Sequence, residues 1–509
     1  MKDYRRFYIG GQWVEPVSEE TLAVIDPSRE EPFATIALAN DRDVDRAVEA
    51  AHRAFEGYSS SRVSDRLELL KNFEREYKLR SSDIAAAITQ EMGAPVALAM
   101  SLQVASGLSH IQAAISVLGS FEFSHRIESD IVVKEPIGVC ALITPWNWPM
   151  NQAVLKIAYA LAAGCTIVFK PSEETPVSAA LMTEALAASG VPAGVFNLIN
   201  GSGPGAGSAL AAHKHVDMVS FTGSTVAGVS VARAGAETVK RVSLELGGKS
   251  PNIILEDADF EDAVVKGAKA VFRNSGQTCL APTRMLVPAK RMAEAARYAR
   301  LAADNTVVGD PLNPGTKVGP LVNARQFDRV QQLIKRGIDE GATLVAGGLG
   351  KPEGLDIGYF VKPTVFSDVE NSMTIAQEEI FGPVLSIIPY ETENDAVRIA
   401  NDTPYGLAGY VWSKNAESAY RVAKQIRAGI VVINGAFPNN LAPFGGMKQS
   451  GNGREQGVMG IEEYLETKVI AGCEDLANRG KTRSVRSRVG RKVSCQVAAQ
   501  KHAAHDCRV

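Results

Sequence analysis

The sequence predicts an α/β protein with more than one domain. Its 509 residues exceed the length at which a single hydrophobic core stops growing, so the chain should divide into two or three domains. Short apolar runs alternate with longer segments of helical periodicity, which is typical of parallel sheets covered by helices. The apolar content of 45% and the charged content of 22% are ordinary for a globular protein.

Composition also limits the partners and the compartment. The formal net charge of −3 gives no reason to expect nucleic acid or an anionic membrane as the main partner. The chain has no long uncharged apolar run and no apolar leader, so we expect neither a membrane span nor a secretory signal. The six cysteines form no C-x-x-C pair and no H-E-x-x-H pattern occurs. We therefore expect a reduced, cytoplasmic protein without a metal site.

The first clear helix is predicted over residues 41–58. We expect Asp41 to cap its N-terminus, because Asp is a favoured N-cap before an apolar periodic segment. The apolar residues recur at helical intervals and should face a core; they are Val44, Ala47, Val48, Ala51 and Phe55.

Three apolar runs farther along the chain are predicted to be buried strands that end in polar loops. They cover residues 138–149, 166–173 and 216–224, and a helix should begin near Thr225 after the third. Because ligands bind at the carboxyl ends of strands in open α/β sheets, the loops after these strands predict a ligand site.

The loop sequences add chemical detail to that prediction. "TPWN" (144–147) follows the first strand, "KPSE" (170–173) the second and "FTGSTVAG" (221–228) the third. A glycine-rich turn that opens a helix presents free N–H groups to a phosphate. The residues of this turn are Gly223, Ser224 and Gly228. Since the turn lacks the G-x-G-x-x-G fingerprint, it predicts a dinucleotide site only together with other motifs.

Two segments stand apart from this alternating pattern. Residues 121–138 alternate and are rich in charge, which predicts a hairpin that is either a surface loop or a subunit-pairing arm. Residues 474–509 hold nine Lys or Arg against three Asp or Glu and few large apolar residues, so we expect disorder there. This tail is either a solvated appendage or a nucleic-acid-binding segment.

Two residues raise the question of catalysis. Cys279, in "SGQTCLAPTR", is either a structural thiol, as most free cysteines are, or a nucleophile. The "GKS" of "LELGGKS" ends like a phosphate-binding loop, but Ser243 stands where that motif requires glycine, which excludes it. Glu245 in the same segment is either a desolvated general base or a capping group.

Eight motifs in order resemble the NAD(P)-dependent aldehyde dehydrogenase superfamily, in particular its bacterial NAD-linked members. They are "TPWNWP", "FKPSEETP", "FTGSTVAG", "LELGGKSPNII", "GQTC", "EEIFGPV", "NDTPYGLAG" and "PFGGMKQSGNGRE", within residues 7–472. The resemblance implies a Rossmann-type cofactor domain, an α/β catalytic domain and a small β oligomerisation element.

The resemblance also implies where these parts lie. The cofactor domain would cover residues 1–121 and 138–245, and the catalytic domain 246–448. Residues 122–137 and 449–473 would form the oligomerisation element of a homodimer or homotetramer, followed by the basic tail.

The catalytic roles follow from the same resemblance. Cys279 would attack the aldehyde, and the side-chain amide of Asn147 with the backbone N–H of Cys279 would stabilise the oxyanion. After hydride transfer, Glu245 would activate the water that hydrolyses the thioester. Relatives that pass the acyl group to coenzyme A lack this glutamate, so we expect a free carboxylic acid.

The cofactor site is expected to favour NAD over NADP. Lys170 and Glu173 would bind the adenosine ribose, where a carboxylate accepts from the 2′-hydroxyl and repels a 2′-phosphate. Ser224 would contact the pyrophosphate. The remaining cofactor residues implied by the resemblance are Ile143, Thr144, Trp146, Gly203, Gly207, Gly223, Glu379 and Phe381.

The substrate pocket is expected to be apolar. Leu280 follows the nucleophile, and the segment 437–444 offers Phe437 and Phe444 but no Arg or Lys for a distal carboxylate. We therefore expect an apolar or aromatic aldehyde from catabolism. A semialdehyde dehydrogenase for a carboxylate-bearing substrate, aromatic or heterocyclic ones included, remains the alternative. A coenzyme A acyl-transferring enzyme and a non-catalytic binding protein on this scaffold are two further alternatives.

Overall fold

The computed structural model describes residues 1–436 and 438–472, which form two compact units. The larger unit contains Met1–Glu122 and Glu135–Glu466. Of the described residues, the smaller unit contains Phe123–Lys134 and 467–472. Phe437 and the basic tail at 474–509 lie outside the described residues, so the predictions made for them are left as they stand.

The larger unit contains an eight-stranded sheet whose five central strands are parallel. The predicted strands at 138–149, 166–173 and 216–224 are confirmed as its buried strands β8, β9 and β11. In spatial order the strands are β20 (Gly451–Asn452), β12 (Arg241–Glu245), β11 (Met218–Thr222), β8 (Val139–Ile143), β9 (Thr166–Lys170), β10 (Phe196–Leu198), β2 (Phe7–Ile9) and β3 (Gln12–Val14).

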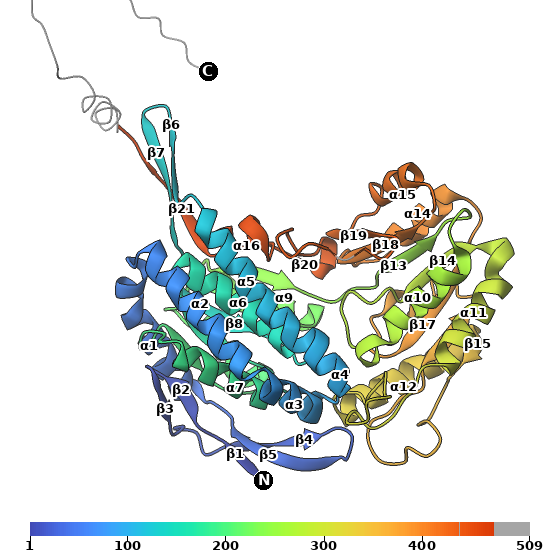
Figure 1. The fold of residues 1–509 in the computed structure, drawn as a ribbon, viewed down its shortest axis with the longest axis horizontal. Coiled ribbons are helices and arrows are strands. Elements are labelled where there is room, and N and C mark those ends of the chain that lie inside the picture. The colour runs from blue at the N-terminus through green and yellow to red at the C-terminus, as the bar shows by residue number, and fades with distance from the viewer. Residues whose placement is uncertain (437, 473–509) are drawn as a thin grey trace, which may run out of the picture. The chain divides into compact units, whose positions relative to one another are not determined.

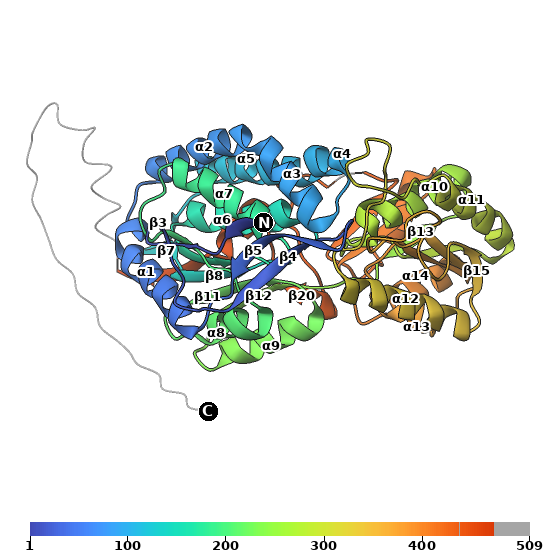
Figure 2. The same ribbon diagram turned by 90° about the horizontal axis from the view of Figure 1, so that it is seen from below.

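Helices cover both faces of this sheet in layers (Figure 2). The helices on one face are α1 (Asp41–Ser59), α8 (Ser208–Ala212) and α9 (Thr225–Ala236). The helices on the other side are α6 (Pro149–Ala163) and α7 (Pro176–Ala188), with α2 (Val63–Leu79), α3 (Ser81–Met92) and α5 (Ala105–Ser120) outside them. A π-helix, η1 (Ala99–Val104), follows the short α4 (Val96–Leu98) and leads into α5.

Helix α6 lies inside this layered structure. Fourteen of its fifteen residues are buried, because the sheet covers one side of it and α5 the other. Pro149 occupies its first turn, where the missing N–H costs nothing, and Gly164 ends it with a φ of 97°. The helix therefore fixes the loop that precedes it, which contains Asn147.

The prediction for the first helix is confirmed except at its cap and at Phe55, which is only half-buried. Asn40, not Asp41, is the N-cap: its side-chain oxygen accepts from the N–H groups of Arg42 at 3.0 Å and Asp43 at 3.2 Å. Asp43 accepts in return from the Asn40 N–H, which completes a capping box. Asp41 already has helical geometry, so its carboxylate stabilises the first turn only through its charge.

A seven-stranded, mostly parallel sheet forms the second layered part of the larger unit (Figure 1). Successive side chains of a strand point to opposite faces of this sheet, so they join different hydrophobic cores. Ile254 packs in the core that contains α10 and α11, whereas Ile253 packs in the core on the opposite face. The strands in spatial order are β15 (Thr343–Ala346), β16 (Thr364–Ser367), β17 (Val384–Tyr390), β14 (Arg284–Pro288), β13 (Pro251–Ile254), β18 (Ala408–Trp412) and β19 (Ile430–Ile433). The helices are α10 (Phe260–Phe272), α11 (Met292–Asp304), α12 (Ala324–Asp339), α13 (Thr374–Gln377), α14 (Glu393–Asn401) and α15 (Ala416–Ala423).

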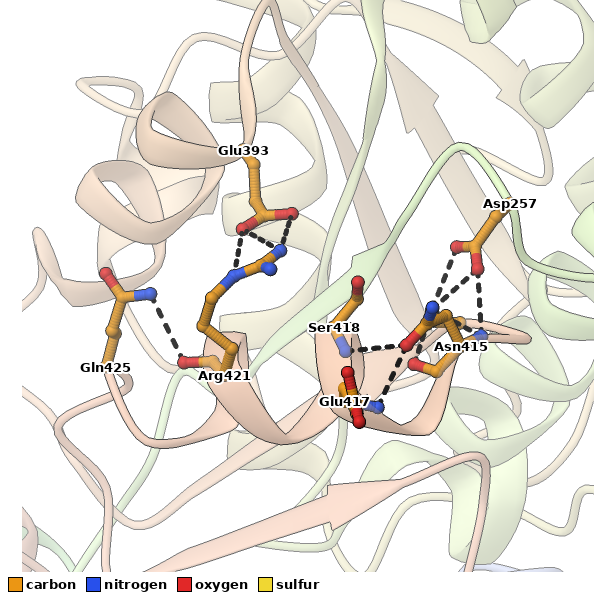
Figure 3. Close-up of polar contacts among 8 residues, drawn as sticks. Asp257, Glu393, Asn415, Glu417, Ser418, Arg421 and Gln425 are labelled. Carbon is orange, nitrogen blue, oxygen red and sulfur yellow. Dashed lines mark hydrogen bonds and ion pairs between the residues drawn. The ribbon is translucent and has the colours of Figure 1, made fainter.

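Polar contacts stabilise helices α14 and α15 and link them to each other (Figure 3). Asn415 caps α15 by accepting from the N–H groups of Glu417 and Ser418, both at 3.0 Å. Arg421 on α15 forms a bidentate ion pair with Glu393 of α14 at 2.7 and 2.8 Å. These contacts stabilise the sheet edge at β18 and β19, whose neighbour β13 follows the segment that contains Glu245.

Two small sheets complete the described chain. The N-terminal one contains β1 (Lys2–Tyr4), β5 (Glu31–Ala37) and β4 (Thr21–Asp26). The predicted hairpin is confirmed as β6 (Ser124–Ile127) and β7 (Asp130–Pro136), with β21 (Leu465–Ile470) beside β7 (Figure 1). Residues 449–466, including β20 and α16 (Gly457–Glu462), belong to the larger unit. Of the helices described, none combines the length and apolar character needed to cross a bilayer.

Candidate active site

One short segment brings three of the predicted site residues together. Glu245 is the last residue of β12, and the segment after it leads to β13 in the other large sheet. A Cβ on Gly248 would lie 2.6 Å from the backbone carbonyl oxygen of Cys279. The N–H of Gly248 donates to the Glu379 carboxylate at 3.0 Å, and Gly247 also lies against that carboxylate. Glycine is required here because the backbone passes directly between Cys279 and Glu379.

A tight loop presents Cys279. Three consecutive residues before it have left-handed backbone geometry: Asn274 with a φ of 54°, Ser275 with 57° and Gly276 with 73°. Two of them are not glycine, so the loop is strained and must be held by its surroundings. The loop itself is buried up to Gln277, whereas Cys279 is partly exposed.

Asn147 is tied to that loop by hydrogen bonds in both directions. Its side-chain N–H donates to the Gln277 carbonyl oxygen at 3.1 Å, and its own carbonyl accepts from the side chains of Asn274 at 2.9 Å and Gln103 at 3.0 Å. The indole N–H of the next residue, Trp148, donates to the hydroxyl of Thr278 at 3.0 Å. Among the described residues, the Asn147 side chain makes no second hydrogen bond, which leaves its other N–H free to donate.

The surroundings of Cys279 keep its thiol protonated at rest. Burial raises the pKa of the thiol to about 12, and the carboxylates of Glu379 and Glu245 act in the same direction. Hydrogen bonds from the backbone N–H groups of Leu280 and of Cys279 itself oppose them by stabilising the thiolate. The thiol is therefore neutral until a proton acceptor or a positive charge comes close.

Glu245 is buried, and its side chain carries no hydrogen bond to the residues described. It is 3% exposed, and both carboxylate oxygens lack partners among the residues described. Burial, and then the nearby Glu455 carboxylate, hold the pKa of Glu245 well above its usual range, while Lys156 acts against them. Glu245 caps no backbone group here, so the capping alternative fails. A buried carboxyl group with a raised pKa is suited to accept and release a proton.

Two charged residues beneath Glu245 were missed by the sequence reasoning. Lys156 of α6 pairs with Glu455 at 2.6 Å, and both are nearly fully buried. Lys156 also donates to the Ser220 hydroxyl at 2.9 Å. The one signal was a lysine within an otherwise uncharged helix. Gln103 and Asn274, which hold Asn147, had no such signal.

Of the residues predicted to bind the adenosine side of the cofactor, some contact one another and others do not. Lys170 is 2% exposed and donates to the carbonyl oxygens of Pro171 at 2.7 Å and Gly201 at 2.6 Å. The Glu173 carboxylate lies 3.6 Å from the Lys170 ammonium and is half-buried. Gly207 approaches the Lys170 side chain, whereas a Cβ on Gly203 would meet no atom within 4 Å. A Cβ on Gly207 would lie 3.7 Å from Lys170, which is ordinary contact, so packing requires glycine at neither position.

The start of α9 fits an anionic ligand. Ser224 is its N-cap and accepts from the Ala227 N–H at 3.3 Å, which leaves earlier N–H groups of the first turn without helical partners. Gly223 donates to the backbone carbonyl of Glu245 at 3.0 Å, so the turn lies beside that residue. These N–H groups, together with Lys170 and Glu173, suit the pyrophosphate and ribose of a dinucleotide.

The remaining predicted residues lie at two places. Ile143 and Thr144 end β8 beside β9, where the Thr144 N–H donates to the Lys170 carbonyl at 3.2 Å. Trp146 meets Phe381 edge-on with ring centroids 5.4 Å apart, and Phe381 has a φ of 58°.

Leu280 and Phe444 are both partly exposed near the catalytic residues. The Leu280 carbonyl accepts from the Tyr410 hydroxyl at 2.9 Å. Phe444 forms two backbone hydrogen bonds with Glu455, both at 2.7 Å, and a Cβ on the next residue, Gly445, would lie 2.8 Å from a Glu245 carboxylate oxygen. The backbone beside Phe444 therefore runs close to Glu245, and the role of Phe444 in a substrate pocket stays a prediction.

Comparison with known proteins gives a consistent result. Residues 13–470 match the aldehyde dehydrogenase family. A 3-succinoylsemialdehyde-pyridine dehydrogenase from a Pseudomonas species is 54% identical over 475 residues, covering 93% of this chain and 100% of the relative.

Solved structures agree in fold. A variant of aldehyde dehydrogenase C from Pseudomonas syringae, in complex with NAD+ and octanal, is 51% identical with a TM-score of 0.92, covering 92% of this chain and 97% of the other. A Mycobacterium tuberculosis aldehyde dehydrogenase complexed with NAD+ is 40% identical with a TM-score of 0.90, covering 92% and 98%.

Proposed function

Because this chain belongs to the aldehyde dehydrogenase family and is an NAD-dependent aldehyde dehydrogenase, we propose that it makes the free carboxylic acid through a thioester on Cys279. The observation that supports this most is the course of residues 245–248. That segment begins with Glu245, lies against the Cys279 backbone and donates to Glu379. A nucleophile, a base and a cofactor-side carboxylate are thus held by one short piece of chain.

Cys279 acts first. The thiol of this partly exposed residue first loses its proton to solvent water. The thiolate then adds to the aldehyde carbon, and the carbonyl oxygen takes up the negative charge. The free side-chain N–H of Asn147 and the backbone N–H of Cys279 then stabilise that oxyanion, an interaction whose loss typically costs about 3 kcal/mol of barrier. Because Asn147 is already fixed by Gln277, Asn274 and Gln103, little reorganisation is needed.

When bound, NAD would accept the hydride that leaves the substrate carbon as the adduct on Cys279 becomes the thioester. Lys170, Glu173, Ser224 and Glu379 would hold it, and Trp146 and Phe381 would pack beside it. The carboxylate of Glu173 favours a ribose hydroxyl over a 2′-phosphate at that place.

Glu245 acts second. It takes a proton from the water that attacks the thioester carbon, the carbon–sulfur bond breaks, and the acid leaves with Cys279 restored. Its raised pKa makes it a stronger base than an exposed carboxylate. The carboxyl group has no hydrogen bond to break first, so the proton transfer meets no competing partner in the described structure.

The substrate is an aldehyde with an apolar or aromatic distal part, used in catabolism. Leu280 and Phe444 support this, as do the relative named for a pyridine-bearing semialdehyde and the structure that contains octanal. We also assign oligomerisation to 122–137 and 449–473 of a cytoplasmic homodimer or homotetramer, since an exposed hairpin edge suits strand pairing between subunits.

The proposal is tested by NADH formation over a panel of aliphatic, aromatic and carboxylate-bearing aldehydes, with NADP and coenzyme A as additional arms. We expect NAD-dependent acid formation, fastest with the apolar and aromatic members and unchanged by coenzyme A. Preference for carboxylate-bearing aldehydes would refute the substrate class, and an acyl-coenzyme A product would refute the role given to Glu245.

A further inference from the structure

The N-cap of helix α12 joins that helix to the loop after β9. The side-chain oxygen of Asn323 accepts from the Gln326 N–H at 2.8 Å, and its side-chain nitrogen donates to the Glu174 carboxylate at 2.7 Å. Because a carboxylate only accepts and an N–H only donates, these two partners fix the orientation of the amide. Glu174 directly follows Glu173, so α12 is tied to the loop to which we assign the adenosine ribose.

Asparagine at position 323 is suited to this double contact. Aspartate caps a helix about as well as asparagine, but it has no N–H to donate to a second carboxylate. Burial raises the pKa of Glu174, and the hydrogen bond from Asn323 lowers it, so this contact stabilises the charged carboxylate. Hydrogen bonds to charged groups are among the stronger ones in proteins. The amide of Asn323 therefore contributes more than a helix cap alone.

The first turns of α12 also hold the segment at the other end of the predicted cofactor site. The Gln326 side chain donates to the carbonyl oxygens of Ile380 at 3.2 Å and Phe381 at 2.9 Å. The Arg329 guanidinium donates to the carbonyl oxygen of Glu379 at 3.1 Å. Phe381 has a φ of 58°, a strained geometry that its surroundings must maintain. All three carbonyl groups of this segment are thus held by two side chains of α12.

We propose that Asn323 is a positioning residue that couples the two ends of the NAD site. Through Glu174 it links the adenosine-side loop to α12, and α12 positions the segment of Glu379 and Phe381. This inference rests on the proposed function, which assigns both segments to NAD. Ends that are already positioned spare a dinucleotide the cost of ordering them. Breaking the link should therefore weaken the binding of a ligand that spans both ends.

The test compares the binding of NAD with that of AMP, which contains only the adenosine end, by titration calorimetry on the complete protein. Asn323→Asp keeps the cap but places a carboxylate against Glu174. We expect its Kd for NAD to rise about tenfold, the value of one hydrogen bond to a charged group, and its Kd for AMP to stay within about threefold. KM for the aldehyde, measured at saturating NAD, should stay within about twofold of the wild-type value.

Further variants separate the link from the cap. Glu174→Gln combined with Asn323→Asp exchanges donor and acceptor, so it should return the Kd for NAD to within about threefold of wild type. Glu174→Leu removes the acceptor and leaves the cap intact. It should weaken NAD binding alone, and it decides the matter if Asn323→Asp fails to fold. Asn313→Asp, the control, makes the same change in an exposed turn, where the side chain accepts from the Gly315 N–H at 2.9 Å, and should alter neither Kd.

Three results would overturn the inference while the proposed function stands. They are equal losses of NAD and AMP binding, an unchanged Kd for NAD, and no recovery in the double variant. A wild-type protein that binds NAD but forms no acid from any aldehyde would refute the proposed function instead, and the two Kd values would still measure the coupling.

Discussion

Gly276 packs directly against the peptide group of Gly382, so that a Cβ on Gly276 would overlap the carbonyl carbon and oxygen of Gly382. Gly276 lies three residues before Cys279, and Gly382 follows Phe381, whose ring meets Trp146. The two segments also share unusual geometry, since Gly276 and Phe381 both have positive φ values, 73° and 58°. The loop of Cys279 and the segment of Phe381, to which we assign the nucleophile and a cofactor contact, are thus positioned by one contact.

Gly276→Ala tests that contact. The new Cβ would force the two segments apart in a backbone region unfavourable to alanine, so we expect a loss of about 2–4 kcal/mol in unfolding free energy. Displacement of Cys279 by as little as about 1 Å should lower kcat about 100-fold. Gly203→Ala is the control, because a Cβ there meets no atom within 4 Å. An alanine variant at 276 with wild-type kcat and stability would show that the loop is not held there.

Glu455→Gln tests whether Glu455 raises the pKa of Glu245. Loss of the Glu455 charge removes the repulsion that raises the pKa of Glu245 and leaves Lys156 unpaired beside it. Both effects lower the pKa of Glu245, so the acid limb of kcat against pH should move to lower pH. Because a weaker base activates water less well, the plateau rate should also fall. An acid limb that moved to higher pH would contradict the assignment of that limb to Glu245.

The control for that profile is Glu417→Gln, an exposed residue at the start of α15 (Figure 3). It removes the same charge far from Glu245 in the sequence and makes no contact with it. Its pH profile should match that of the wild type.

Glu173→Ala tests the cofactor preference. Removal of the carboxylate abolishes the repulsion of a 2′-phosphate, while the Lys170 ammonium remains 3.6 Å from the place of the lost charge. We expect kcat/KM for NADP to rise relative to NAD by about tenfold or more, since 1.4 kcal/mol corresponds to that factor. Glu184→Ala on the exposed side of α7 serves as the matched control. An unchanged ratio in the Glu173 variant would exclude this residue as the discriminator.

The sequence predicted well what depends on local patterns. The strands β8, β9 and β11 were found because they are short apolar runs ended by Pro or Gly, and the hairpin at β6 and β7 because its residues alternate. The helix cap was misplaced by one residue, since Asn40 and Asp41 are both good caps and only the backbone distinguishes them.

Contacts between distant parts of the chain were beyond prediction. Lys156 and Glu455 are 299 residues apart, and no local pattern links a lysine on α6 to a glutamate near the C-terminus. Asn274 appears in sequence as an ordinary neighbour of Cys279, but a left-handed backbone turns its side chain toward Asn147. Tertiary packing imposes that geometry.

The most direct test of the central claim is rapid-mixing kinetics of NADH formation by Glu245→Gln, with the acylated residue identified by peptide mass spectrometry. We predict a stoichiometric burst of NADH, then a steady state at least about 100-fold slower than wild type, with the acyl group on Cys279. Cys279→Ala, the blank, should bind NAD and form no NADH. Acylation slowed as much as hydrolysis, without a burst, would contradict the division of roles between Cys279 and Glu245.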